Sequence, residues 1–179
     1  NKDYLRLSET EKIDFLKSKL NSHKNIINKF QFKNKENKEV WSTFNTLSEE
    51  PSECLGAYVI SMTSSASDIL SVSFLQKEAK IKNKLRVVPL FETLDDLINA
   101  KSIMENLFSH KWYRNLIKHK QEVMIGYSDS SKDAGKMCAS WHQYKAQEEI
   151  VKLGNKYKID ITFFHGRGGS AGRGGGPIQ

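Results

Sequence analysis

The apolar residues of the chain follow two different patterns, one before Pro51 and one after it. Before Pro51 they recur at helical spacing, and Ser8 with Glu11 three positions later forms a capping box that predicts the start of a helix. The polar stretch 21–38 predicts a surface loop between this helix and a second one. Residues 1–56 are therefore expected to form a helical region. The apolar positions assigned to its two helices are Ile13, Leu16, Leu20, Val40, Trp41, Phe44 and Leu47.

After Pro51 the chain carries four short apolar runs, which are Ala57–Met62, Val87–Phe91, Val123–Tyr127 and Ile159–Phe164. The runs are continuous rather than alternating, which is typical of parallel strands covered on both faces. They begin at residues 57, 87, 123 and 159, so successive runs start 30, 36 and 36 residues apart. One strand with its crossover helix needs about 30 residues or more. Residues 57–179 are therefore predicted to form consecutive βα units.

The segments between these runs carry helix signals of their own. Ser67 is placed to cap a helix that runs through Ala79, and Thr93 with Asp96 forms a second capping box. Ser131 precedes a third, longer amphipathic segment. The residues assigned to the core side of this last helix are Met137, Cys138, Trp141, Tyr144 and Ile150.

Polar residues stand at the carboxyl end of each of the four predicted strands. In a (β/α)8 barrel the active-site groups project from that rim, each from a different strand. Four units cannot close a barrel by themselves, and an open doubly wound sheet fits the same rhythm, but the polar strand ends favour the barrel. We predict an α/β fold that is part of a (β/α)8 TIM-type barrel, with about four βα units preceded by helices. The polar residues are Ser61, Glu92, Asp129 and His165 with Arg167, and Ser61 is the weakest member because a serine there more often turns the chain.

Two of these residues are candidate metal ligands. Glu92 and Asp129 follow successive strands and could share Mg²⁺, a hard cation that accepts a couple of carboxylates and keeps its other positions for water and substrate oxygens. The alternative makes Glu92 a cap partner and Asp129 the N-cap of the next helix. Lys132 could neutralise a substrate anion or simply face solvent.

The last strand runs directly into a glycine-rich loop, residues 165–177, that holds two of the five arginines of the chain. Glycines let backbone N–H groups converge on a ligand, and Arg167 and Arg173 offer planar forks for phosphate or carboxylate, so we expect an oxyanion site. His165 could serve there as a general acid, a general base or a hydrogen-bond donor, or be structural. Residues 166–171 also satisfy a dinucleotide-binding pattern weakly, and arginine–glycine repeats occur in RNA-binding segments.

Charge and cysteine content add less. The net charge is +7, but the excess is mostly lysine scattered along the chain, without the aromatic-interleaved basic run that nucleic-acid binding favours. Cys54 and Cys138 are isolated, which fits a reducing cytoplasm, and no apolar run approaches the ~18 residues that a membrane span needs. The chain opens on Asn1 and stops just after the glycine loop, and we interpret it as a piece of a longer protein.

Five motifs together resemble phosphoenolpyruvate carboxylase. They are YVISM (58–62), VVPLFETLDDL (87–97), VMIGYSDSSKDAG (123–135), SWHQYKAQE (140–148) and TFFHGRGGSAGRGGGP (162–177). The likeness runs in order from about residue 57 to the end, whereas the first 50 residues are much less distinctive. The resemblance implies an enzyme of the cytoplasm that uses Mg²⁺ or Mn²⁺ to join bicarbonate to phosphoenolpyruvate, giving oxaloacetate and phosphate through carboxyphosphate and a metal-stabilised enolate.

The resemblance also assigns roles to residues. It implies that Glu92 and Asp129 are the metal ligands, that Arg167 grips the substrate phosphate, and that His165 lies in the same pocket. It implies that Arg173 serves the active site and binds the inhibitory carboxylate of aspartate or malate. A homotetramer is expected for the full-length protein, with neither nucleic acid nor membrane as a partner.

The departures from the family pattern matter as well. The family's upstream TAHPTE-type motif, which carries a catalytic histidine, is absent, as are the downstream lysine, arginine and asparagine of the effector site. We therefore expect the 179-residue chain to be inactive alone. The alternative is a binding-only basic α/β module whose glycine–arginine segment contacts nucleic acid.

Overall fold

The computed structural model describes residues 4–27, 32 and 34–167. The chain forms two compact units that alternate along the sequence, one made of residues 1–58 and 67–87 and the other of residues 59–66 and 88–179. Each unit is described by itself below.

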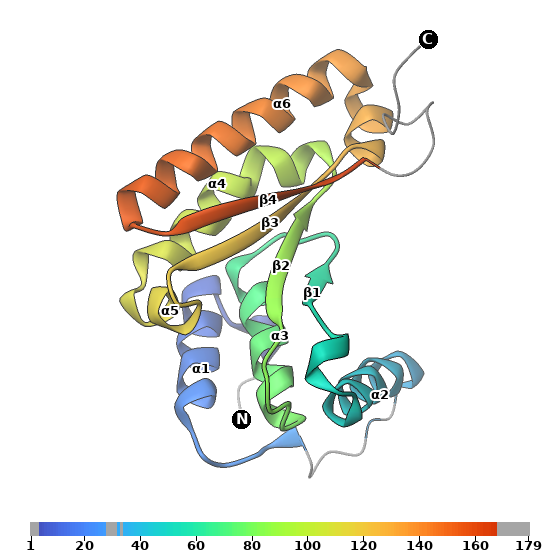
Figure 1. Cartoon of the computed structure of the whole chain (residues 1–179), viewed down its shortest axis with the longest axis vertical. Helices are drawn as coiled ribbons and strands as arrows, with labels where there is room; N and C mark the ends of the chain where they lie inside the picture. The colour runs from blue at the N-terminus through green and yellow to red at the C-terminus, as the bar shows by residue number, and fades with distance from the viewer. Residues whose placement is uncertain (1–3, 28–31, 33, 168–179) are drawn as a thin grey trace. The chain divides into compact units, whose positions relative to one another are not determined.

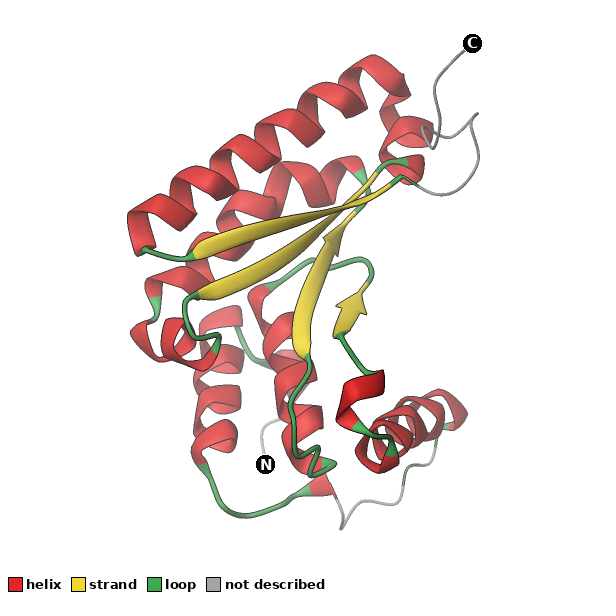
Figure 2. Ribbon diagram, viewed as in Figure 1, coloured by secondary structure: helices red, strands yellow, loops and turns green. Residues whose placement is uncertain are grey.

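The described elements, shown in Figures 1 and 2, begin with helices and continue as alternating strands and helices. A four-stranded sheet has the order β1-β2-β3-β4, and β3 pairs in parallel with both β2 and β4. The prediction of four strands separated by helices is therefore confirmed, and the short helix α5 is an addition that the sequence pattern did not predict. The elements are η1 (Tyr4–Arg6), α1 (Glu9–Asn21), α2 (Lys35–Glu49), η3 (Ser52–Cys54), β1 (Ala57–Ile60), α3 (Ala66–Glu78), β2 (Arg86–Phe91), α4 (Leu94–Ser109), α5 (Lys111–Leu116), β3 (Lys120–Gly126), α6 (Ser128–Tyr157) and β4 (Asp160–Gly166).

The first unit contains the predicted capping box. The Ser8 backbone N–H donates to the Glu11 carboxylate over 2.9 Å, and the Ser8 hydroxyl accepts from the Glu11 N–H, so α1 begins where the sequence predicted. Ser67 does not cap α3, because that helix already begins at Ala66. Its N–H and hydroxyl instead donate to the Glu9 carboxylate over 2.7 and 2.9 Å, which joins the starts of α1 and α3.

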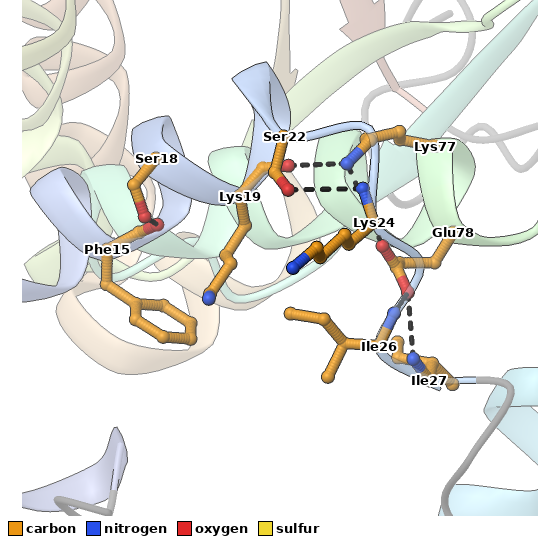
Figure 3. A network of polar contacts seen from close by, with 9 residues as sticks. All are labelled: Phe15, Ser18, Lys19, Ser22, Lys24, Ile26, Ile27, Lys77 and Glu78. Atoms are coloured by element: carbon orange, nitrogen blue, oxygen red, sulfur yellow. Dashed lines mark hydrogen bonds and ion pairs between the residues drawn. The ribbon is translucent and has the colours of Figure 1, made fainter.

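A buried carboxylate holds the chain that leaves α1, as Figure 3 shows. Glu78, at the end of α3, is only 1% exposed, and its Oε2 accepts the backbone N–H groups of Ile26 and Ile27. The Lys77 ammonium lies 3.9 Å from its other oxygen and donates to the Lys19 carbonyl. A charge buried to this degree is tolerated because it is hydrogen-bonded and has a cation nearby.

In the second unit α4 and α6 pack against each other along one side of β3 and β4 (Figure 1). Alternate residues of β3, among them Val123 and Ile125, are buried, while Met124 between them is only half-buried. Phe164, opposite Met124 on β4, is 53% exposed. The expectation that these strands are covered on both faces is therefore wrong for β3 and β4 in the described part of the chain, since one face of the pair stays open.

The long helix α6 differs most from its prediction. It begins at Ser128 rather than near Ser131, and Gly135 breaks it with φ 76° and ψ 157°. Met137, Cys138, Trp141 and Tyr144 are exposed, with Met137 at 88%, so the prediction that they form the core side is wrong. The helix buries a different stripe instead, which includes the small residues Ala139 and Ala146, and α4 lies close against the helix. The buried positions after the break are Ala139, Gln143, Ala146, Ile150, Leu153 and Gly154.

None of the helices within residues 4–27 and 34–167 combines the length and the apolar character that crossing a membrane requires.

Candidate functional site at the carboxyl ends of the strands

Three consecutive parallel strands, β2, β3 and β4, end at one edge of the sheet, and the candidate residues stand at these ends. Glu92 directly follows β2, Asp129 is the second residue of α6 just beyond β3, and His165 lies at the end of β4. The register pairs Phe91 with Ile125 and Ile125 with His165, which aligns the three ends. This is the edge at which α/β folds collect their binding groups.

The backbone of Glu92 is held from both sides. Its N–H and that of Thr93 donate to the Asp96 carboxylate over 3.2 and 3.0 Å, which completes the predicted capping box of α4. Its carbonyl accepts the Ser130 N–H over 2.8 Å, which attaches the first turn of α6. Glu92 and the turn that carries Asp129 are therefore fixed to each other through main-chain contacts.

A close approach between β2 and β3 supports this arrangement. A Cβ atom built at Gly126 would stand 2.5 Å from the Glu92 Cβ and 2.9 Å from its Cα. No other residue type fits there without a shift, so the last residue of β3 is glycine for a packing reason.

A buried amide ties the same turn to the strand. Gln143, in the later part of α6, is 5% exposed, and its Nε2 donates to the Gly126 carbonyl over 3.1 Å and to the Ser130 hydroxyl over 3.2 Å. Both acceptors are buried, so removing this donor leaves them without their partner. Gln143 lies within the motif 140–148, but its role was not predicted, because it depends on which helix face packs inward.

The two candidate ligand carboxyl groups lie close enough to influence each other's pKa. The pKa of Glu92 is raised, first because burial removes water from the carboxylate, and further because Asp129 and Asp96 are close by and Asp129 shares a hydrogen bond with it. The Met62 N–H, which donates to Glu92 Oε1 over 3.2 Å, opposes this rise. Like charges held this close favour a proton or a cation between them.

Asp129 has the opposite shift. Its pKa is lowered, chiefly by the hydrogen bond from the Lys132 ammonium, whose Nζ lies 2.9 Å from Oδ1. The Ser128 hydroxyl, which donates to Asp129 Oδ2 over 3.3 Å, and a hydrogen bond shared with Glu92 lower the pKa of Asp129 further. The Lys132 side chain is 66% exposed, as the solvent-facing alternative expects, and its ammonium also pairs with Asp129. The alternative of Asp129 as an N-cap is wrong, because the N-cap position is Tyr127 and makes no side-chain cap bond.

His165 and Arg167 are joined by a residue that the sequence did not single out. The Tyr127 hydroxyl lies 2.8 Å from His165 Nδ1, and the Arg167 guanidinium carbon lies 5.1 Å from the centre of the Tyr127 ring. Tyr127 ended the predicted strand and lay within the motif 123–135, and these were the signals for it. Arg173 and the glycine loop from residue 168 onward lie outside the described residues.

The edge thus brings together Glu92, Asp129 and Lys132 on one side and His165 with Arg167 on the other. Ser61 is exposed just beyond β1, and it is the neighbouring Met62 that reaches Glu92 through its backbone, with φ at 50°. Within the described ranges no cluster of three or more His, Cys, Asp or Glu side chains is arranged to hold a metal ion.

Comparison with known proteins accounts for the whole chain. A family model described as phosphoenolpyruvate carboxylase matches residues 1–179, including the helical region that the motifs did not distinguish. Phosphoenolpyruvate carboxylase of Flaveria pringlei and phosphoenolpyruvate carboxylase 3 of Arabidopsis thaliana are each 52% identical over 176 residues. Phosphoenolpyruvate carboxylase 1 of Sorghum bicolor is 49% identical over the same length. These alignments cover 98% of this chain and 18% of each relative. The chain belongs to the phosphoenolpyruvate carboxylase family.

Proposed function

We propose that the chain is part of a carboxylase that joins bicarbonate to phosphoenolpyruvate and releases oxaloacetate and phosphate, a carbon-fixing reaction that replenishes oxaloacetate. The reaction proceeds through carboxyphosphate and the enolate of pyruvate. The observation that carries the proposal is the family match over all 179 residues, joined to the attachment of the Asp129 turn to Glu92 at the aligned strand ends. We prefer the enzyme function to the binding-only module, because membership of an enzyme family accounts for the glycine–arginine loop without nucleic-acid binding.

The donor set fits Mg²⁺ or Mn²⁺. Glu92 and Asp129 are close enough to influence each other's pKa. Two oxygens bound to one Mg²⁺ can be up to ~4.2 Å apart, twice the ~2.0–2.1 Å bond length, so neighbouring carboxylates suit this ion. Two carboxylates with the remaining positions left to water and substrate are what this ion prefers. When bound, the ion supplies positive charge that lowers the cost of charge developing on substrate oxygens.

The residues of the chain bind and orient the substrate. The Arg167 guanidinium neutralises the phosphoryl oxygens through paired N–H groups, and the Lys132 ammonium supplies a second positive charge beside Asp129. His165, the neighbour of Arg167 through Tyr127, offers a ring nitrogen to the same substrate. Arg173 serves catalysis and also binds aspartate or malate as inhibitor, as its motif in the family implies.

The fold proposal goes beyond the four described strands. The strands lie side by side in the order in which they occur in the sequence, as they do in a barrel. In a doubly wound sheet the strand order reverses at a switch point. We therefore infer a partial (β/α)8 barrel over residues 57–179 with a helical region over residues 1–56. The full-length protein is proposed to be a cytoplasmic homotetramer.

Metal binding by the 179-residue chain tests the site. Mn²⁺ titration followed by electron paramagnetic resonance should show binding that Glu92→Gln and Asp129→Asn each weaken by at least about 10-fold, because each removes one anionic ligand. Asp95→Asn, which changes an exposed carboxylate of the same α4 turn, is the matched control. Equal affinity in all four proteins would contradict the metal assignment.

Activity tests the reaction. In the full-length enzyme the two ligand variants should abolish oxaloacetate formation, measured by coupled NADH oxidation. The chain by itself should form no oxaloacetate, because the family's histidine motif lies outside it. Turnover by the chain alone would overturn the claim that essential groups are missing.

A further inference from the structure

The Tyr127 side chain contacts both His165, through its hydroxyl, and Arg167, through its ring. We propose that Tyr127 is a positioning residue: its hydroxyl donates to His165 Nδ1 and holds the neutral imidazole in the tautomer with hydrogen on Nε2, while its ring supports the Arg167 guanidinium. This inference rests on the proposed function only for the ligand that His165 and Arg167 bind.

The strand geometry explains why the contact forms. His165 on β4 lies opposite Ile125 on β3, and Tyr127 is two residues beyond Ile125, so its side chain starts from the same face of the sheet and reaches diagonally to the histidine. The Ser131 hydroxyl donates to the Tyr127 carbonyl over 2.8 Å, which fixes the backbone of Tyr127 at the start of α6. The two rings lie 6.0 Å apart between centroids.

The direction of the hydrogen bond follows from the chemistry of the two groups. A neutral imidazole has one nitrogen that donates and one that accepts, and a phenol hydroxyl has a single hydrogen to give. The phenol oxygen is the weaker acceptor of the pair, because its lone pairs are shared with the ring. The positive guanidinium of Arg167, 5.1 Å from the ring centre, draws on the same electrons and favours the hydroxyl further as a donor. Nδ1 therefore accepts, and the hydrogen of the ring stays on Nε2.

The consequence is a pair of donors held side by side. With Nδ1 occupied by Tyr127, His165 presents an Nε2–H group, and Arg167 presents its guanidinium N–H groups. Both suit oxygens of a phosphorylated carboxylic acid. His165 in this tautomer donates a hydrogen bond to the substrate and does not abstract a proton from it through Nε2.

The chain contains its own reference for the opposite tautomer. His119 Nδ1 lies 2.9 Å from the Lys158 carbonyl oxygen, which can only accept, so neutral His119 must carry its hydrogen on Nδ1. The two histidines should therefore give opposite patterns in a spectrum that resolves imidazole nitrogens.

Nitrogen-15 NMR of the histidine rings in the 179-residue chain, recorded where the imidazoles are neutral, tests the proposal. His165 should show the Nε2–H pattern and His119 the Nδ1–H pattern. Tyr127→Phe should shift His165 toward a mixture of tautomers while keeping the ring under Arg167, and Tyr144→Phe, on the exposed side of α6, should change neither histidine. An Nδ1–H pattern at His165, or a His165 spectrum that Tyr127→Phe leaves unchanged, overturns the proposal.

Kinetics of the full-length enzyme separate this inference from the proposed function. Tyr127→Phe should lower kcat/KM for phosphoenolpyruvate by about 3- to 10-fold, the loss of one hydrogen bond, with no change in the metal concentration that gives half-maximal rate. Unchanged kcat/KM in an active enzyme refutes the positioning role alone. Wild-type protein without carboxylase activity refutes the proposed function but leaves the tautomer result standing.

Discussion

Replacing Gly126 with alanine tests whether close packing between β2 and β3 sets the position of Glu92. The new Cβ would stand 2.5 and 2.9 Å from the Glu92 Cβ and Cα, whereas carbon atoms in ordinary contact are about 3.5–4.0 Å apart. The strands must therefore separate by about 1 Å at this point. The Glu92 side cannot move freely, because its N–H is bound to Asp96 and its carbonyl to the Ser130 N–H.

The expected cost follows from these contacts. Overpacking of this kind costs about 1–3 kcal/mol, and replacing glycine with alanine returns about 0.4–1 kcal/mol by restricting the unfolded chain. We expect Gly126→Ala to lower the free energy of unfolding by roughly 1–2 kcal/mol, which combines the same two terms. The same change should weaken Mn²⁺ binding, since it displaces one proposed ligand relative to the other.

Urea unfolding followed by two-dimensional NMR measures this loss, because it reports on signals of the second unit separately from those of the first. Gly56→Ala is the matched control, since a Cβ there meets nothing within 4 Å. It should be neutral or slightly stabilising. If Gly126→Ala unfolds at the same urea concentration as Gly56→Ala and binds Mn²⁺ as the wild type does, the packing explanation is incorrect.

Three further predictions concern buried and charged groups. Glu78→Leu should lower the free energy of unfolding by about 2–4 kcal/mol, because two backbone N–H groups lose their buried acceptor. The control Glu49→Leu, at the exposed end of α2, should change it by less than about 0.5 kcal/mol. Equal unfolding midpoints of the two variants in urea would argue against the buried contact. Gln143→Leu should cost about 1–3 kcal/mol and broaden NMR signals of the first turn of α6, and a turn that keeps its spectrum would show that the amide does not hold it. Lys132→Met should raise the pKa of Asp129 toward its ordinary value, as measured by carbon-13 titration of the carboxyl group. Because the folded-state pKa of Asp129 is lowered, its contribution to stability is present above the unfolded-state pKa and is lost as pH falls through the folded-state pKa. On acidification the free energy of unfolding of Lys132→Met should therefore fall less than that of the wild type.

The sequence predicted the elements well where the signal was local. The capping boxes at Ser8 and Thr93 are present, because each depends on residues three positions apart. The strand ends that carry Glu92 and Asp129 were also predicted, since parallel strands joined by helices finish at one edge. The proximity of those two carboxyl groups depends on strand register, which no single segment of sequence encodes.

The wrong prediction of which residues of α6 are buried has a physical origin. The prediction assigned large apolar residues such as Trp141 to the core, because burying them removes the most surface from water. α6 instead packs Ala139 and Ala146 inward, and small residues let two helices approach each other closely. When two helices approach closely, they gain contacts along their whole length. In α6 the large apolar residues and the small residues both recur at helical spacing, so periodicity cannot show which of the two stripes is buried.

The positions of the proposed site residues depend on Gly135 and Gln143, to which no role was assigned from the sequence although both lie within the motifs 123–135 and 140–148. Asp129 belongs to the short first part of α6, and Gly135 separates this part from the rest of the helix with φ and ψ values that are open almost only to glycine. The first part is therefore not held by continuation of the helix and needs its own attachments. The Glu92 carbonyl and the buried Gln143 amide supply them, one from the neighbouring strand end and one from the later part of α6. The Glu92 and Asp129 carboxylates are therefore positioned by main-chain and amide contacts as well as by their own bonds to the Met62 N–H and the Lys132 ammonium.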